Sequence, residues 1–220
     1  LSDKDFDYLD SNKKEFVKTV LPIIINENQN ILMIRSFVNE LKGKLETFRT
    51  LNNNEIRKLN DIAKKYNIKH QNKHKLDLVD EILSNVDVIP NSIVLAQAAI
   101  ESGWGKSRFA KEYNALFGEY TYDDSEGVIP LERENGDTHL IKAFSSYSNS
   151  VKSYFDNINS HYAYEDFRDI RNIMRKRNNF SNVNLLVNKL STYAEDENYI
   201  KTITQVIKTN NFAIFDQKTI

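Results

Sequence analysis

The chain has 220 residues, 40% hydrophobic and 11% aromatic, which is enough apolar material for a packed core and excludes wholesale disorder. Thirty basic and 31 acidic residues give a formal net charge of −1, which argues against a general electrostatic attraction to nucleic acid. The sequence has no cysteine, which excludes disulfides, thiolate metal sites and cysteine nucleophiles.

The first part of the chain is expected to form one long helix over about residues 11–48. Its apolar residues, from Phe16 to Phe48, recur at alternating steps of three and four. Glu27 falls on this apolar stripe. Because buried glutamate is rare, we expect the stripe to shift locally to Ile23 and Ile25; the alternative is a buried, functional carboxylate.

Shorter helices are predicted next. Asn52–Asn54 is expected to start the second helix, and a third carries apolar residues from Leu76 to Leu83. After Pro90, Asn91 or Ser92 is expected to cap a helix over 93–102 that is apolar nearly all round, and therefore central and buried. Two glycines then end it.

The segment after residue 127 departs from the helical pattern. Two short extended runs, 128–133 and 138–144, flank Asn135-Gly136, a dipeptide typical of tight β-hairpins. Helices are predicted again at about 148–160, 164–177, 183–193 and 198–208. The expected fold class is therefore α+β, mainly helical, with one small β-hairpin lobe.

Glu101 is the main catalytic candidate. A nearly all-apolar helix carries this single carboxylate at its C-terminal end, where burial and the negative end of the helix dipole both favour a raised pKa. A carboxylic acid in that state can protonate a leaving oxygen, as a general acid does. The alternative is a structural ion pair with Arg108.

A second carboxylate is expected from the hairpin. Glu132 and Glu134 share one face of their strand, and Glu126 is near in sequence. Two carboxyl groups across a cleft are typical of glycoside hydrolases, whereas acids on a hairpin are otherwise a solvated face. Aromatic residues near Glu101 and further along the chain are candidates for stacking on sugars, and about half of such aromatics are expected to lie in the core instead. The candidates are Trp104, Phe117, Tyr120 and Tyr193.

Two other patterns have simpler interpretations. His70 and His74 have the spacing of helical zinc ligands, but no third ligand is in view, so a solvated face is expected and no metal is assigned. The basic strip on one helix is interpreted as a charged helix surface rather than a site for an anionic polymer: Arg168, Arg171, Arg175, Lys176 and Arg177.

Three motifs resemble bacterial β-N-acetylglucosaminidases of glycoside hydrolase family 73. They are Ala-Gln-Ala-Ala-Ile-Glu-Ser-Gly-Trp-Gly at 96–105, Asn-Ala-Leu-Phe-Gly at 114–118, and Tyr-Ala-Glu-Asp-Glu-Asn-Tyr at 193–199. The second has one inserted residue, and the third departs from the family pattern at Glu195 and Glu197. Within the family, the N-terminal Leu21-Pro22-Ile23 and Glu27-Asn28-Gln29 segments and the 107–110 run resemble Bax-like bacterial proteins.

The resemblance implies a lysozyme-like fold, with a helical lobe and a β-hairpin lobe flanking a cleft. It implies a glycoside hydrolase of peptidoglycan glycan strands that cleaves after N-acetylglucosamine, with Glu101 as the general acid. It aligns Glu132 with the second catalytic glutamate, with Glu134 or Glu126 as alternatives because this hairpin is shorter. Tyr193 matches a tyrosine that lines the cleft.

The expected organisation is an N-terminal helical arm at 1–70 and a catalytic domain at 71–220. We expect no metal or organic cofactor, no nucleic-acid partner, no membrane-spanning segment and an extracytoplasmic location, the chain being a trimmed or mature form without an export signal. The alternatives are a lytic transglycosylase or muramidase, and a non-catalytic cell-wall binding scaffold.

Overall fold

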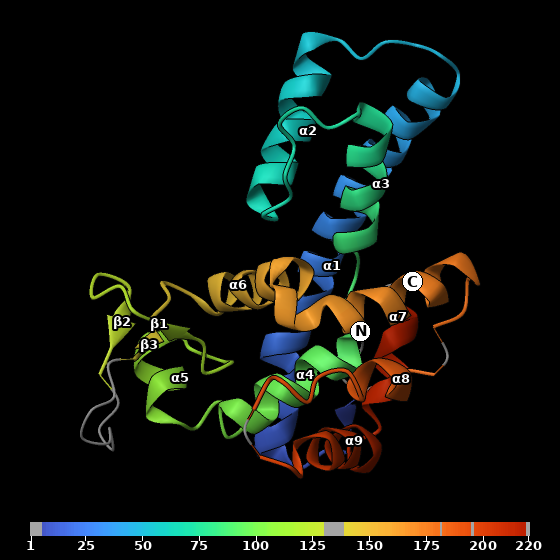
Figure 1. Ribbon diagram of the computed structural model, residues 1–220. Coiled ribbons are helices and arrows are strands. Elements are labelled where there is room, and N and C mark those ends of the chain that lie inside the picture. The colour runs from blue at the N-terminus through green and yellow to red at the C-terminus, as the bar shows by residue number, and fades with distance from the viewer. Residues whose placement is uncertain (1–5, 130–138, 181, 195, 219–220) are drawn as a thin grey trace. The chain divides into compact units, whose positions relative to one another are not determined.

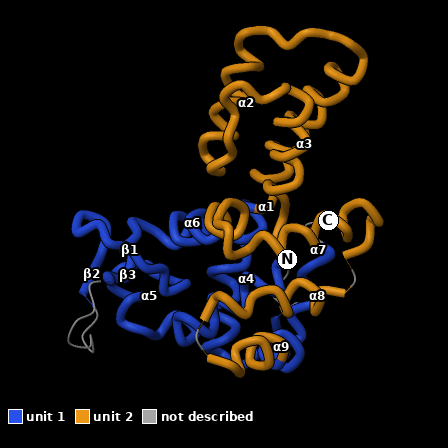
Figure 2. The backbone as a smooth tube through the Cα atoms, in the orientation of Figure 1, with its two compact units in different colours: residues 1–27, 90–154, 205–220 blue, residues 28–89, 155–204 orange. Residues whose placement is uncertain are grey.

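The computed structural model describes residues 6–129, 139–180, 182–194 and 196–218 (Figure 1). The chain forms two compact units, each gathered from several stretches of sequence (Figure 2). Unit 1 comprises residues 1–27, 90–154 and 205–220, and unit 2 comprises 28–89 and 155–204. The helices α1 (Ser11–Glu46), α6 (Tyr147–Ser160) and α9 (Tyr199–Thr209) contribute residues to both units. Residue 70, the predicted end of the N-terminal arm, lies within unit 2.

Unit 1 contains α4 (Asn91–Glu101), α5 (Arg108–Tyr113), a small sheet and the C-terminal 3-10 helix η3 (Phe212–Lys218). The sheet has the order β1-β3-β2 and is antiparallel, with β1 at Tyr120–Thr121, β2 at Gly127–Val128 and β3 at Leu140–Lys142. Pairing of β2 with β3 agrees with the predicted strands, whereas β1 is too short for a periodic signal. The predicted Asn135-Gly136 turn lies outside the described residues.

Unit 2 contains α2 (Asn53–Lys65), α3 (Lys75–Asn85), η2 (Tyr162–Tyr164), α7 (Glu165–Lys176) and α8 (Asn184–Val187). A capping box starts α2: the Asn52 side chain accepts from the Glu55 amide, and the Glu55 carboxylate accepts from the Asn52 amide. The predicted start of this helix is therefore confirmed. The predicted helix over 183–193 is mostly turn, because α8 ends after four residues.

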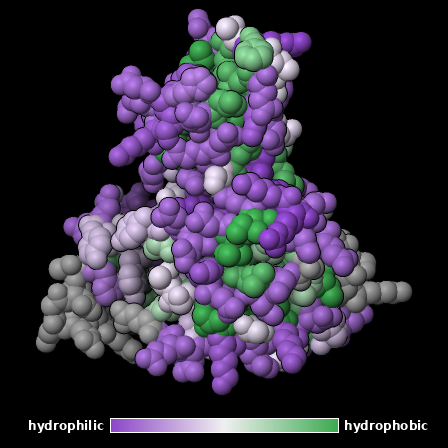
Figure 3. Space-filling view, turned by 45° about the vertical axis from the view of Figure 1, so that its right-hand side comes forward, coloured by the Kyte–Doolittle hydropathy of each residue, from purple (hydrophilic) through white to green (hydrophobic). Residues whose placement is uncertain are grey.

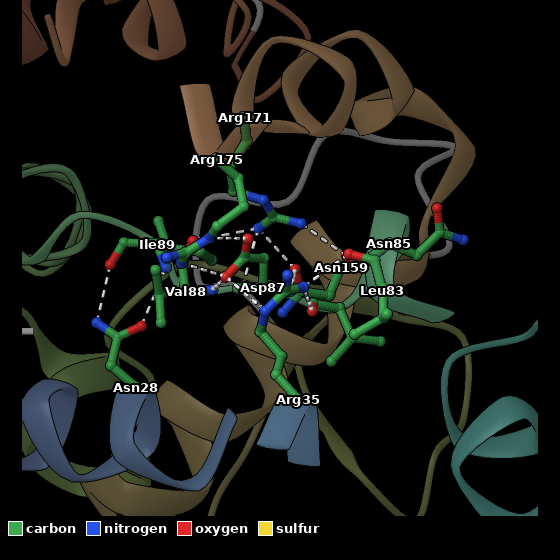
Figure 4. Close-up of polar contacts among 11 residues, drawn as sticks. Asn28, Arg35, Leu83, Asn85, Asp87, Val88, Ile89, Asn159, Arg171 and Arg175 are labelled. Atoms are coloured by element: carbon green, nitrogen blue, oxygen red, sulfur yellow. Dashed lines mark hydrogen bonds and ion pairs between the residues drawn. The ribbon is translucent and has the colours of Figure 1, made fainter. Parts of the chain in front are cut away.

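A buried cluster of charges occupies the C-terminal end of α3 (Figure 4). Asp87, which is fully buried, pairs with Arg35 at 3.3 Å and with Arg175 at 2.6 Å. Arg171 is also fully buried and donates to the Asn85 and Asp87 carbonyls at 2.7 and 3.0 Å. Burial lowers the pKa of Arg171 to about 9, which still leaves it charged at neutral pH.

This cluster corrects the interpretation of the basic strip. Arg168 is 6% exposed and Arg171 is 0% exposed, so neither lies on a solvated helix surface. Arg168 donates to the Ile158 and His161 carbonyls. Backbone carbonyls take the place of solvent around these two arginines, whereas Lys176 and Arg177 are exposed, as expected of a charged helix surface.

Glu27 also differs from expectation. It is 8% exposed, and its neighbours Ile23 and Ile25 are only half-buried, so the buried stripe of α1 runs through Glu27 rather than around it. The expected local shift of the stripe is wrong.

Hydrophilic side chains cover most of the face drawn in Figure 3, interrupted by smaller areas of hydrophobic residues. Within the described part of the chain, no helix combines the length and the apolar character needed to cross a membrane.

Candidate active site

The helix α4 positions Glu101. Every residue from Asn91 to Ala99 is buried, and Glu101 is the last residue of the helix and half-buried. A helix buried on all sides cannot rotate or slide without disturbing close-packed neighbours. The carboxylate at its end is therefore presented from a rigid support.

The opposite end of α4 is held by η3. The Asp216 carboxylate accepts from the Ser92 amide at 2.8 Å and from the Ser92 hydroxyl at 2.7 Å, and the Asn91 side chain donates to the Phe215 carbonyl at 2.8 Å. These bonds take the role of an N-cap, since Pro90 at the cap position offers no side-chain acceptor. Burial raises the pKa of Asp216 to about 6, and the hydrogen bonds from Ser92 offset this only in part.

The chain leaves α4 through a strained turn. Gly103, Trp104 and Gly105 all have left-handed backbones, with φ of 56°, 59° and 73°. For tryptophan this conformation costs about 1–2 kcal/mol. The Ser102 hydroxyl holds the turn, donating to the Ala98 carbonyl at 2.5 Å and accepting from the Gly105 amide at 2.8 Å.

The second sequence motif lies against Glu101. Gly118 has a φ of 61°, and a Cβ added there would be 3.7 Å from Oε2 of Glu101. Two hydrogen bonds fix the segment leading to Gly118. The Asn114 side-chain amide donates to the Phe144 carbonyl, and the Ser150 hydroxyl accepts from the Leu116 backbone amide. Two motifs separated in sequence thus form one site around this carboxylate.

Glu119 is a carboxylate that the sequence analysis missed. It follows Gly118 directly, is half-buried, and its Oε2 accepts from the Ser153 hydroxyl at 2.7 Å. Its signal in the sequence was its place at the end of the Asn-Ala-Leu-Phe-Gly motif.

The predicted hairpin acids have different outcomes. Glu132 and Glu134 lie outside the described residues. Glu126 is exposed in the turn between β1 and β2, and its carboxylate pairs with Lys142 at 3.3 Å. Arg108, considered as an ion-pair partner of Glu101, lies over the Phe109 ring and donates to the Ile129 carbonyl at 3.4 Å.

The predicted aromatic residues lie in unlike environments. Phe117 is 2% exposed and stacks on Tyr154 at 4.3 Å, so it supports the site from the core rather than offering an open face to a sugar. Tyr120 is 65% exposed on β1, with its ring 4.4 Å from that of His139. Trp104 is half-buried, and its ring packs edge-on against Phe16.

Tyr193 belongs to unit 2. Its ring lies parallel to that of Tyr199, with the centroids 5.8 Å apart. The two tyrosines of the third motif are therefore paired with each other.

His70 and His74 were considered above as a pair with the spacing of zinc ligands. His70 lies 3.3 Å from the Ile68 carbonyl through Nδ1. Among the described residues, no group of three or more His, Cys, Asp or Glu side chains is placed to hold a metal ion.

A family model for glucosaminidases, described as mannosyl-glycoprotein endo-beta-N-acetylglucosaminidase, matches residues 76–212. The chain belongs to this glucosaminidase family. Membership confirms the resemblance drawn from the three motifs, and with it the predicted lysozyme-like, mainly helical α+β fold of a glycoside hydrolase family.

The individual relatives of this chain differ in coverage. Protein bax of Escherichia coli K12 is 33% identical over 184 residues, which are 83% of this chain and 63% of that protein. Peptidoglycan hydrolase FlgJ is 33% identical in Escherichia coli K12 and 32% in Salmonella typhimurium, over 93 residues, or 36% of this chain and 29% of FlgJ. The chain thus spans less than two thirds of these relatives.

Among solved structures, the catalytic domain of the autolysin Auto from Listeria monocytogenes matches with a TM-score of 0.45 and 18% identity. The match covers 87% of this chain and 97% of that domain.

Proposed function

We propose that the chain is a peptidoglycan hydrolase, an endo-β-N-acetylglucosaminidase that cleaves the glycan strand after N-acetylglucosamine. The observation that carries the proposal is the half-buried Glu101 carboxylate at the end of a buried helix, 3.7 Å from the Cβ position of Gly118. Membership in the glucosaminidase family and the relation to FlgJ, a peptidoglycan hydrolase, support it.

Glu101 acts as the general acid in this mechanism. It protonates the glycosidic oxygen as the bond to the anomeric carbon breaks and an oxocarbenium-like transition state develops. The rigid support of α4 holds the acid near the leaving oxygen, which lowers the entropic part of the barrier. The open backbone at Gly118 leaves room for a sugar beside the carboxylate.

A second carboxylate stabilises the transition state or positions water. Glu132 is favoured for this role through its family match, and Glu134 and Glu126 are alternatives. The acetamido group of the substrate can serve as the nucleophile instead, in which case this carboxylate orients it. Neither route needs a metal or an organic cofactor, and the substrate places the enzyme outside the cytoplasm.

The test is digestion of purified peptidoglycan, with mass spectrometry of the new chain ends. Glu101→Gln removes the transferable proton, so we expect turnover to fall by roughly 10²-fold or more with the fold retained. Glu112→Gln is the matched control, since Glu112 is an exposed acid on α5 of the same unit.

Reducing N-acetylglucosamine ends that depend on Glu101 would support the proposal. Anhydro-muramic ends would identify a lytic transglycosylase, for which Glu132→Gln would have little effect. Binding without release by the wild-type chain would identify a scaffold. Near-normal turnover of Glu101→Gln would overturn the role of this residue.

A further inference from the structure

Unit 1 contains a pocket of about 360 Å³ behind the turn that follows Glu101. Its apolar part is made by Phe16 of α1, Trp104 of the turn and Tyr147 of α6. The turn lies directly on α1, because a Cβ added at Gly105 would be 3.2 Å from the Phe16 ring and 3.9 Å from the Tyr147 hydroxyl. The pocket therefore shares its wall with the backbone that leads away from the catalytic acid.

The aromatic wall is fixed by packing. Trp104 lies 5.7 Å from Phe16 and 6.1 Å from Phe212 between ring centroids, and the Lys13 ammonium lies 4.9 Å above its ring. Burial raises the pKa of the Tyr147 hydroxyl. A wall of fixed rings in partly desolvated surroundings suits the methyl and methylene groups of a ligand.

The rim of the pocket carries charges of both signs. Lys106 and Lys111 are exposed, and neither has an ion-pair partner among the described residues. Glu15 is the only acid among the lining residues, and its carboxylate likewise has no ion-pair partner in the described chain. Some lysines elsewhere in the described chain, such as Lys42 and Lys189, are paired with carboxylates.

This pattern fits a particular class of ligand. Two lysines match carboxylates, one glutamate matches an amine, and the rings match small aliphatic groups. The stem peptide of peptidoglycan carries all three: several carboxylates, a free amine on its diamino residue, and alanine methyl groups. A purely anionic polymer would leave Glu15 opposed to a like charge.

We propose that this pocket binds the acidic stem peptide of the strand on which Glu101 acts. The inference rests on the proposed function and deepens it, since it names the part of the substrate that lies outside the cleaved bond. Peptides branch from alternate sugars of the glycan strand, so one branch lies beside each scissile bond. Binding energy at the branch then helps to hold the strand at Glu101.

The chain provides its own reporter for peptide binding, because Trp104 is its single tryptophan. A synthetic stem tetrapeptide with glutamate and a diamino residue, added to Glu101→Gln protein, is expected to change tryptophan fluorescence in a saturable manner. Adding K106Q and K111Q together should weaken this affinity roughly tenfold, since two partly exposed ion pairs are lost. The control pair K201Q and K208Q removes the same charge from exposed positions of α9.

A second measurement uses the active enzyme on glycan strands with their peptides and on strands stripped by an amidase. The wild type is expected to have a lower KM for the peptide-bearing strands, and the lysine pair variant should lose most of that preference. The proposal would be overturned if the K106Q/K111Q variant and the K201Q/K208Q control bound the peptide with equal affinity. It would also be overturned if the fluorescence responded only to peptide-free glycan. The second result would make Trp104 part of a sugar subsite.

The two proposals fail separately. If neither kind of strand is cleaved in a manner dependent on Glu101, the hydrolase assignment fails, and the lysine-dependent fluorescence response still decides whether the pocket binds peptide. If both strands are cleaved equally well and no response is seen, the hydrolase assignment stands and the peptide site is overturned.

Discussion

At the scale of single residues, the site depends on backbone conformations that side chains rarely adopt. Gly118 combines a left-handed φ with a place beside the Glu101 carboxylate. Glycine adopts this conformation without strain and is the usual residue where the backbone must come close to a functional group. A glycine offers that approach, because it leaves the space in front of the acid unoccupied.

Gly118→Ala tests this arrangement. Its methyl group would lie 3.7 Å from Oε2 of Glu101, at the side where we place the sugar, so turnover should fall at least tenfold below that of the control. The control is Gly103→Ala, which has a φ of 56° and nothing within 4 Å of the added Cβ. Both variants should lose about 1–2 kcal/mol of unfolding free energy from the strained φ. Equal turnover of the two would contradict a special role for Gly118.

At the scale of elements, two polar anchors hold helix ends. The Asp216 carboxylate of η3 caps the N-terminus of α4, and the arginines around Asp87 bind the carbonyls at the C-terminus of α3. Each anchor takes up backbone groups that a helix leaves unbonded at its ends. Both anchors bring together residues that are far apart in the sequence.

The Asp216 anchor predicts a pH dependence of stability. Its pKa is about 6 in the folded chain against an ordinary 3.8, so the folded state binds the proton more tightly than the unfolded state. The free energy of unfolding should therefore fall as pH rises from about 4 to 6, by at most about 3 kcal/mol from this group.

Asp216→Asn keeps an acceptor for Ser92 and removes the titration. The difference in unfolding free energy between the variant and the wild type should shift in favour of the variant between pH 4 and pH 7. Urea unfolding of both proteins at several pH values between 4 and 7 measures this difference in unfolding free energy. Parallel profiles for the two proteins would show that this carboxylate has a similar pKa in both states.

The Asp87 anchor predicts a large loss of stability. Three arginines hold the pKa of Asp87 below its usual range in spite of burial. Asp87→Asn leaves the buried Arg171 and the half-buried Arg35 and Arg175 without this counter-charge, so the unfolding free energy should fall by about 3–5 kcal/mol. Asp61→Asn, at an exposed position of α2, is the control and should change stability by less than about 0.5 kcal/mol. A loss as small as that of the control would mean that water reaches the cluster.

At the scale of the whole molecule, each compact unit draws on stretches that are far apart in the sequence. Unit 1 contains the start of the chain, its middle and its end, and the first half of α1 belongs to the same unit as Glu101. Five apolar side chains of this half-helix are at most 6% exposed: Phe16, Val17, Val20, Leu21 and Ile24.

A chain reduced to residues 71–220 tests the predicted boundary. Removing these five side chains would take away roughly 10 kcal/mol of burial, which is comparable to the whole stability of an ordinary domain. We expect the shortened chain to lack a cooperative thermal transition and hydrolytic activity, both measured beside the full chain. A cooperative transition near that of the full chain would support the predicted boundary at residue 70.

Local chemistry made much of this protein predictable from its sequence. The apolar periodicity of α1, the capping residues before α2 and the apolar run of α4 act over a few residues, and each gave the correct element. The absence of cysteine from the sequence was enough to exclude cysteine chemistry, because that conclusion needs no knowledge of which residues are in contact. The three motifs indicated the glucosaminidase family because their residue order is specific.

Only the tertiary structure decided which polar groups meet. Periodicity assigns a residue to a helix face but does not say what covers that face. The sequence therefore predicts Glu27 and Arg171 outside the core, whereas the structure buries both. Gly118 and Glu101 are 17 positions apart in the sequence, and Ser92 and Asp216, which share a hydrogen bond, are 124 apart, yet each pair lies close together in space. Such pairings follow from packing and from the cost of leaving buried polar groups unbonded, both of which act through space rather than along the chain.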